Sequence, residues 1–207
     1  YVQSDDFYID KEKQMVIITD QMKNQALTYD LNTYQHLSTI DLPFYFDSYI
    51  QLPDKSFVWY RLLGFKETRD EYYIRITDST YQNSAYFLEA PFTTSLGLFN
   101  GTFYERAEQM HFYMPFSPVV YEVTSQEIKP VYNISFRKHK FPPVDYMRSI
   151  VADGATYYDK ELLHSGYLAA YSISETDNII TIAYLVDNKM NVDIYNKKDK
   201  KSYQNPE

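Results

Sequence analysis

The stretch VIITDQMKNQALTYDL, residues 16–31, decides the fold, because alternating apolar residues occur in it twice, on either side of a polar turn. Alternation with a period of two places successive side chains on opposite faces of a sheet. The pattern also occurs just before, in DFYID (6–10), and just after, in HLSTI (36–40). The links between these runs are short and rich in Asp and Asn, which favour tight turns. Residues 5–43 are therefore predicted to form a four-stranded antiparallel sheet.

The same unit recurs three more times along the 207 residues. The first three units follow one another within the period of about 40 to 50 residues that is typical of a propeller blade. Four-stranded sheets stacked around an axis cover each other's faces and protect their short edges. We predict an all-β fold, a single and partial β-propeller domain over residues 1–207. Its blades are expected at 5–43, 44–91, 95–137 and 167–204.

A segment near residues 142–165 interrupts the strand pattern before the fourth blade. It opens with two consecutive prolines, which cannot continue a strand ladder. Apolar side chains then fall one helical turn apart, at Met147, Ile150 and Val151. This spacing predicts one short amphipathic helix. Insertions in repeat folds map to loops on one face, often the binding face.

Composition restricts the class of protein. Twenty basic against 28 acidic residues give a net charge of -8, which argues against a nucleic-acid partner. The absence of cysteine excludes disulfides and thiolate zinc sites.

No apolar run approaches the roughly 20 residues that a transmembrane helix needs. The chain opens with Tyr1 almost directly in a strand pattern, so we expect it to be a piece of a longer protein.

The unit DFYIDKEKQMVIITDQMKNQALTYDLNTYQHLSTIDLP, residues 6–43, resembles the blades of NHL-like six-bladed β-propellers, especially those of Bacteroides and related bacteria. One departure is Asn32-Thr33, where that family often has a turn with glycine. The positions that match the blade pattern are Asp6, Phe7, Ile9, Asp10, Ile18, Asp20, Tyr29, Asp30, Leu42 and Pro43.

The resemblance implies an exported protein of the periplasm or cell surface, made as a lipoprotein, because family members begin with such signals. Its motifs specify blades and carry no catalytic signature. Four blades against six in the family imply that blades are missing at one or both ends. Two uncovered blade faces would result, and we expect the chain either to dimerise through them or to be less stable than the longer protein.

A search for reactive groups yields no catalytic residues, metal site or cofactor. The four histidines do not have metal-ligand spacing, and neither a nucleophile elbow nor a glycine-rich phosphate loop is present. Asp10, Asp20 and Asp30 recur every ten positions, which could indicate a carboxylate array. We interpret them instead as residues that end strands and begin turns.

The candidate ligand-binding residues lie in or beside the insertion: Tyr157, Tyr158, His164 and Tyr167. Tyrosine offers an apolar ring with a polar end, which suits a glycan or a peptide. The alternative is that the many aromatic residues fill the space between blades.

Three functions follow from these observations. The first is a non-catalytic binding or interaction module of the bacterial cell envelope. The second is an enzyme at the mouth of the propeller channel, a metal-dependent hydrolase or lyase. The third is a structural or assembly role. Since function is argued from a site and not from a fold, the first depends on the ligand-binding residues above.

Overall fold

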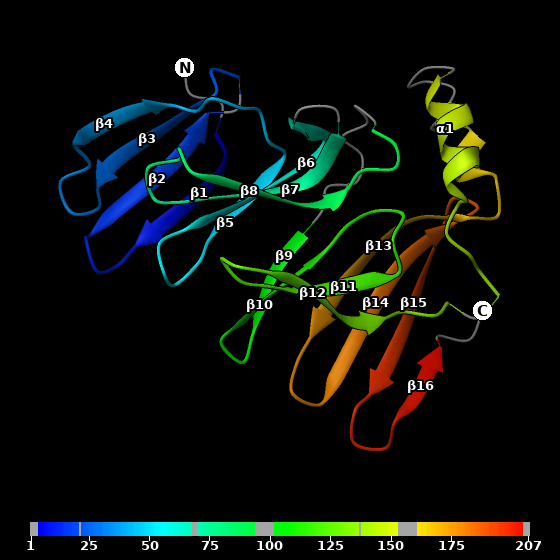
Figure 1. The fold of residues 1–207 in the computed structure, drawn as a ribbon. Helices are drawn as coiled ribbons and strands as arrows, with labels where there is room; N and C mark the ends of the chain where they lie inside the picture. Colours follow the sequence, from blue (N-terminus) through cyan, green and yellow to red (C-terminus); the bar gives the residue numbers. More distant parts are fainter. Residues whose placement is uncertain are drawn as a thin grey trace. The chain divides into compact units, whose positions relative to one another are not determined.

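The computed structural model describes residues 4–20, 22–67, 70–93, 102–136, 138–152 and 161–204. These residues form four separate sheets of four antiparallel strands, with the short helix α1 (Val144–Ala152) between the third and fourth sheets in sequence (Figure 1). Each sheet is a simple meander in which strands adjacent in sequence pair. The predicted all-β, propeller-type fold with a short helical insertion is thereby confirmed. The chain divides into two compact units, residues 1–90 and 91–207, and each is described by itself.

The first unit contains two of the sheets. One sheet consists of β1 (Ser4–Asp10), β2 (Met15–Asp20), β3 (Gln25–Asp30) and β4 (His36–Asp41). The other consists of β5 (Ser48–Gln51), β6 (Phe57–Glu67), β7 (Asp70–Thr77) and β8 (Ser84–Glu89).

The second unit contains the other two sheets and the helix. One sheet consists of β9 (Thr102–Arg106), β10 (Gln109–Tyr113), β11 (Val119–Val123) and β12 (Ile128–Asn133). Helix α1 (Val144–Ala152) follows, as the spacing of its apolar residues predicts. The last sheet consists of β13 (Leu168–Glu175), β14 (Ile179–Val186), β15 (Lys189–Asn196) and β16 (Lys201–Gln204).

Aspartates at the ends of strands hold the turns of the β1–β4 sheet. Asp10 Oδ1 accepts the backbone N–H groups of Glu12 and Lys13, each at 3.1 Å. Asp20 does the same at the next turn, with the N–H of Lys23 at 3.0 Å. Asp30 repeats the arrangement after β3. The interpretation of these three acids as turn residues is confirmed.

The core of the first unit is built around Trp59, whose side chain is completely buried. Its indole N–H donates to the Thr77 hydroxyl at 2.9 Å, so the buried ring has its polar atom satisfied. Phe44 and Phe46 pack edge-on against it, while Tyr45 between them is exposed. Aromatic side chains therefore do fill the space between sheets in this unit.

Two apolar clusters support the second unit. In the first, Met147 and Ile150 of α1 are buried together with Leu162 and Ala169. The helix is thus held by the i, i+3 face that its sequence predicts. In the second, Phe136 lies edge-on to Tyr184 of β14, with ring centroids 5.0 Å apart.

Candidate functional site

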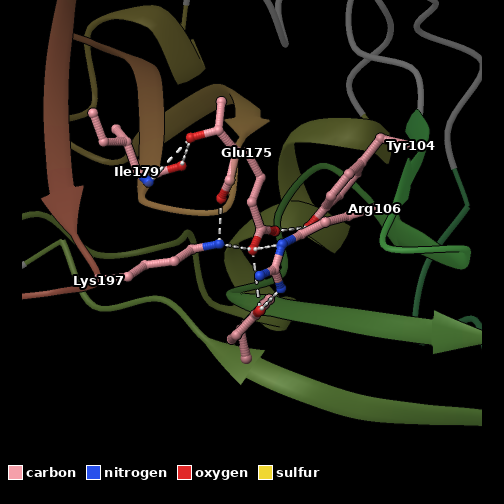
Figure 2. Close-up of polar contacts among 7 residues, drawn as sticks. Tyr104, Arg106, Glu175, Ile179 and Lys197 are labelled. Carbon is pink, nitrogen blue, oxygen red and sulfur yellow. Dashed lines mark hydrogen bonds and ion pairs between the residues drawn. The ribbon is translucent and has the colours of Figure 1, made fainter.

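A buried carboxylate, Glu175, lies at the end of β13, and none of its side-chain surface is accessible to solvent. Burying an ionised carboxylate is costly unless it is paired and hydrogen-bonded. Figure 2 shows side chains from β9 and from the turn after β15 converging on it. The carboxylate therefore joins the β9–β12 sheet to the β13–β16 sheet.

Four side chains contact the Glu175 carboxylate: Lys197, Tyr104 and Tyr132 donate hydrogen bonds to it, and Arg106 forms an ion pair with it. The ammonium group of Lys197 lies 2.6 Å from Oε1, and Nε of Arg106 lies 3.1 Å from the same oxygen. The Tyr104 hydroxyl donates to Oε2 at 3.0 Å, and the Tyr132 hydroxyl donates to Oε1 at 3.1 Å. We call these five residues the Glu175 cluster.

The environment of the cluster shifts the pKa values of its members. Burial by itself would raise the pKa of Glu175. The hydrogen bonds from Lys197 and Tyr104, with the charges of Lys197 and Arg106, outweigh that effect and hold the pKa below its ordinary value. Burial and the neighbouring carboxylate both raise the pKa of Tyr104 and of Tyr132. At neutral pH the cluster therefore contains an ionised carboxylate and two neutral phenols.

His111 of β10 lies between the two tyrosines of the cluster. Its ring is stacked on Tyr104 at a centroid distance of 5.1 Å and on Tyr132 at 6.3 Å, with interplanar angles of 18° and 17°. The histidine is buried. Each tyrosine thus gives one ring face to His111 and its hydroxyl to Glu175, which fixes both rings.

A cleft with a volume of about 480 Å³ adjoins the cluster, between the β9–β12 and β13–β16 sheets. Seven aliphatic side chains form much of its wall, and Tyr104, Tyr132 and Glu175 lie along it. Its volume is within the range of about 300 to 1,000 Å³ that is usual for small-ligand sites. The aliphatic residues are Val120, Val131, Ile134, Ile173, Ile180, Ile182 and Ile194.

The Glu175 cluster is better suited to stabilising the contact between the two sheets than to acid–base catalysis. A general acid or base works best with a pKa near the operating pH, and the pKa of Glu175 is shifted away from neutrality. Both of its oxygens accept hydrogen bonds from the cluster. Among the described residues, no group of three or more His, Asp or Glu side chains is placed to hold a metal ion.

Of the four site residues predicted from sequence, the structure describes His164 and Tyr167. Tyr157 and Tyr158 are outside the described residues. His164 is exposed, and Tyr167 is partly buried in the apolar cluster around α1, where its ring lies 5.1 Å from that of Tyr146. Neither His164 nor Tyr167 lines the cleft.

Sequence reasoning did not find the Glu175 cluster, although one signal was present. With a period of two, Glu175 shares a face of β13 with Ile173 and Tyr171. An acidic residue on the strand face that otherwise carries inward-pointing side chains indicates that a buried cation or hydrogen-bond donor pairs with it. Its partners could not be assigned, because Tyr104 and Tyr132 are 71 and 43 residues away.

Comparison with known proteins agrees with this architecture. The family model DUF5128, described as a 6-bladed beta-propeller, matches residues 1–206. No curated protein sequence matches the chain. In the described residues, no helix has the length and apolar character needed to cross a membrane.

The solved structures that are similar to the chain include two from Bacteroides species. A Bacteroides fragilis protein inferred to be exported aligns with a TM-score of 0.86 and 23% sequence identity, over 100% of this chain and 58% of its own. A DUF4221 family member from Bacteroides vulgatus aligns with a TM-score of 0.53 and 8% identity, over 94% of this chain and 64% of its own. The chain thus spans less than two thirds of the length of either neighbour.

Proposed function

The chain belongs to the DUF5128 family of 6-bladed β-propellers, and from this premise we propose that it is part of an exported, non-catalytic binding module that takes a peptide. The ligand would insert aliphatic side chains into the cleft between the β9–β12 and β13–β16 sheets. The observation that carries the proposal is the 480 Å³ cleft, with its aliphatic wall and a fixed polar cluster beside it.

The lining of the cleft matches the general character of ligand sites. Such sites are mainly apolar and carry a few well-placed polar groups. Here Ile173, Ile180 and Ile182 supply apolar wall, while Asn133 and Ser135 supply polar groups at the end of β12. A peptide would use both, because its side chains are separated by backbone amides that need hydrogen-bond partners.

The geometry favours a peptide over a glycan. Sugar recognition uses flat aromatic faces. The two tyrosines of the cluster each give one ring face to His111 and have their hydroxyls on Glu175. Branched aliphatic side chains outnumber aromatic ones on the cleft wall, where Phe136 and Tyr195 are the other two aromatic residues.

The cellular setting is part of the proposal. The Bacteroides fragilis neighbour is inferred to be exported, and it shares the fold over the whole of this chain. We therefore place the binding module in the cell envelope.

The experiment is a thermal-shift screen with capped hexapeptides in which Ser alternates with Ile, Phe or Asp, beside a panel of neutral and acidic oligosaccharides. A ligand at 100 times its dissociation constant adds about 2.7 kcal/mol of stability. We expect a concentration-dependent rise in melting temperature with the Ser-Ile or Ser-Phe peptides and none with Ser-Asp. A rise with oligosaccharides alone, or with no member of either panel, would overturn the peptide proposal.

A further inference from the structure

Arg75 of β7 lies between two aromatic rings in the first unit. The guanidinium carbon is 3.9 Å from the ring centroid of Phe44 and 5.6 Å from that of Tyr86. In the sheet register Arg75 stands between Trp59 of β6 and Tyr86 of β8. Ring faces attract a cation and hold a guanidinium flat, so the orientation of this side chain is fixed.

Most of the N–H donors of the Arg75 guanidinium have no acceptor among the described residues. A guanidinium carries five N–H donors. In the described part of the chain, Nε donates to the Ser84 hydroxyl at 2.9 Å, and no carboxylate forms an ion pair with the group. The four N–H donors on Nη1 and Nη2 are left for an acceptor from outside these residues.

The surroundings of Arg75 differ from those of Arg106, which is also partly buried. Arg106 faces a carboxylate, Glu175, at 3.1 Å. Arg75 is half-buried, and burial lowers the pKa of its guanidinium. A partly desolvated cation without a counter-charge costs stability, which aromatic faces offset only in part.

We propose that Arg75 is the anchor of an oxyanion-binding site, and that a carboxylate or phosphate of a ligand accepts two parallel hydrogen bonds from Nη1 and Nη2. The planar fork of arginine matches both groups in this bidentate manner. Because Nε is already bound to Ser84, the Nη1–Nη2 edge is the one left for the ligand. Arg75 belongs to the first unit, and the cleft assigned to the peptide belongs to the second.

Trp59 provides the readout. It is the single tryptophan of the sequence, and its ring lies 5.1 Å from Phe44, the ring that carries the guanidinium. Its emission would be followed during titration with sodium glucuronate and with sodium phosphate. Sodium chloride at equal ionic strength and glucose serve as controls. We expect a saturable change with one or both oxyanions and none with the controls, and the two arms distinguish the carboxylate from the phosphate source.

Two variants assign the effect to Arg75. Arg75→Lys keeps the charge and loses the fork, so we expect binding to weaken at least about tenfold. Arg61→Lys is the matched control, because Arg61 also lies over a ring, that of Tyr45 at 5.8 Å. Titration of the unaltered chain without a saturable change, or unaltered binding in Arg75→Lys, would overturn the proposal.

Discussion

The hydroxyl of Tyr104 donates a hydrogen bond to Glu175 at 3.0 Å, although 71 residues separate the two in sequence. Tyr104 is on β9, the first strand of its sheet, and Glu175 ends β13, the first strand of the next. The bond therefore connects the corresponding strands of two successive sheets. Because the Glu175 side chain is fully buried, its removal has consequences that an exposed ion pair would not have.

Replacing Glu175 by Gln should destabilise the second unit by about 2 to 4 kcal/mol, because it leaves two partly buried cations without their carboxylate. Lys197 and Arg106 retain only 18% and 26% of their side-chain exposure. Urea unfolding followed by far-ultraviolet circular dichroism would measure the loss.

Glu122→Gln is the matched control for that variant. Glu122 is on β11 and pairs with Lys129 at 3.3 Å, but half of the lysine side chain is exposed. An exposed partner makes such a pair worth less than about 1 kcal/mol. Equal losses in Glu175→Gln and Glu122→Gln would contradict the role given to the Glu175 cluster.

Acid should weaken the same contact. The pKa of Glu175 is lower in the folded chain than its ordinary value of 4.5. Its contribution to stability is therefore complete above that value and is lost as the pH falls through the lower, folded pKa. The difference in unfolding free energy between the unaltered chain and Glu175→Gln should shrink between neutral pH and about pH 3. A difference that stays constant over this interval would show that the ionised carboxylate is not what stabilises the contact.

The blades could be predicted from sequence because the information for them is local. In the β1–β4 sheet, period-two alternation is followed within a few residues by an aspartate at the end of each strand. The turn bonds of Asp10 and Asp20 span only two or three residues. The helix follows from Met147 and Ile150 in the same way. Local hydrogen bonding and side-chain alternation are thus enough to predict the strands and the helix.

The site could not be predicted, because it depends on how one sheet packs on the next. The cleft is the space left by side chains of seven strands and the segment after β12. Sequence reasoning favoured Tyr157, Tyr158, His164 and Tyr167 because their segment interrupts the strand pattern. The packing of Tyr167 against Tyr146 depends on the position of α1, which spacing alone does not give.

The turn aspartates offer a test of local structure. Asp10→Ala removes the acceptor of two backbone N–H groups at a buried position and should cost about 1 kcal/mol or more. Asp10→Asn keeps a side-chain oxygen and should cost less. Chemical denaturation of both variants would measure the difference, and equal losses would assign the effect to the charges of Lys13 and Lys55 nearby.

Variants in and beside the insertion can show which of its tyrosines pack in the core and which bind a ligand. Tyr167→Ala should lower stability by about 2 kcal/mol, because the ring packs against Tyr146 and the buried face of α1. The prediction from sequence that Tyr157 and Tyr158 bind a ligand is a separate one, and it requires Tyr157→Ala with Tyr158→Ala to weaken binding with little loss of stability. Melting temperatures and titrations with the ligand from the screen would be compared. A large fall in melting temperature in the double variant would mean that these two tyrosines belong to the core.

The cleft itself can be filled without disturbing the fold. Val131 of β12 lines the cleft and is 36% exposed, so a larger side chain can be accommodated at its position. Val131→Trp should occupy the space meant for a ligand side chain. We expect peptide binding to fall by at least about tenfold while the melting temperature stays the same or rises.

Val144→Trp provides the comparison for Val131→Trp. Val144 begins α1, is 38% exposed and does not line the cleft. Isothermal titration of both variants with the best Ser-Ile or Ser-Phe peptide would separate a local block from a general effect of an added tryptophan. If Val131→Trp binds the peptide as the unaltered chain does, or if both variants lose binding equally, the peptide does not enter this cleft. If Val131→Trp alone loses binding and remains folded, the space between these two sheets is where the peptide's side chains are held.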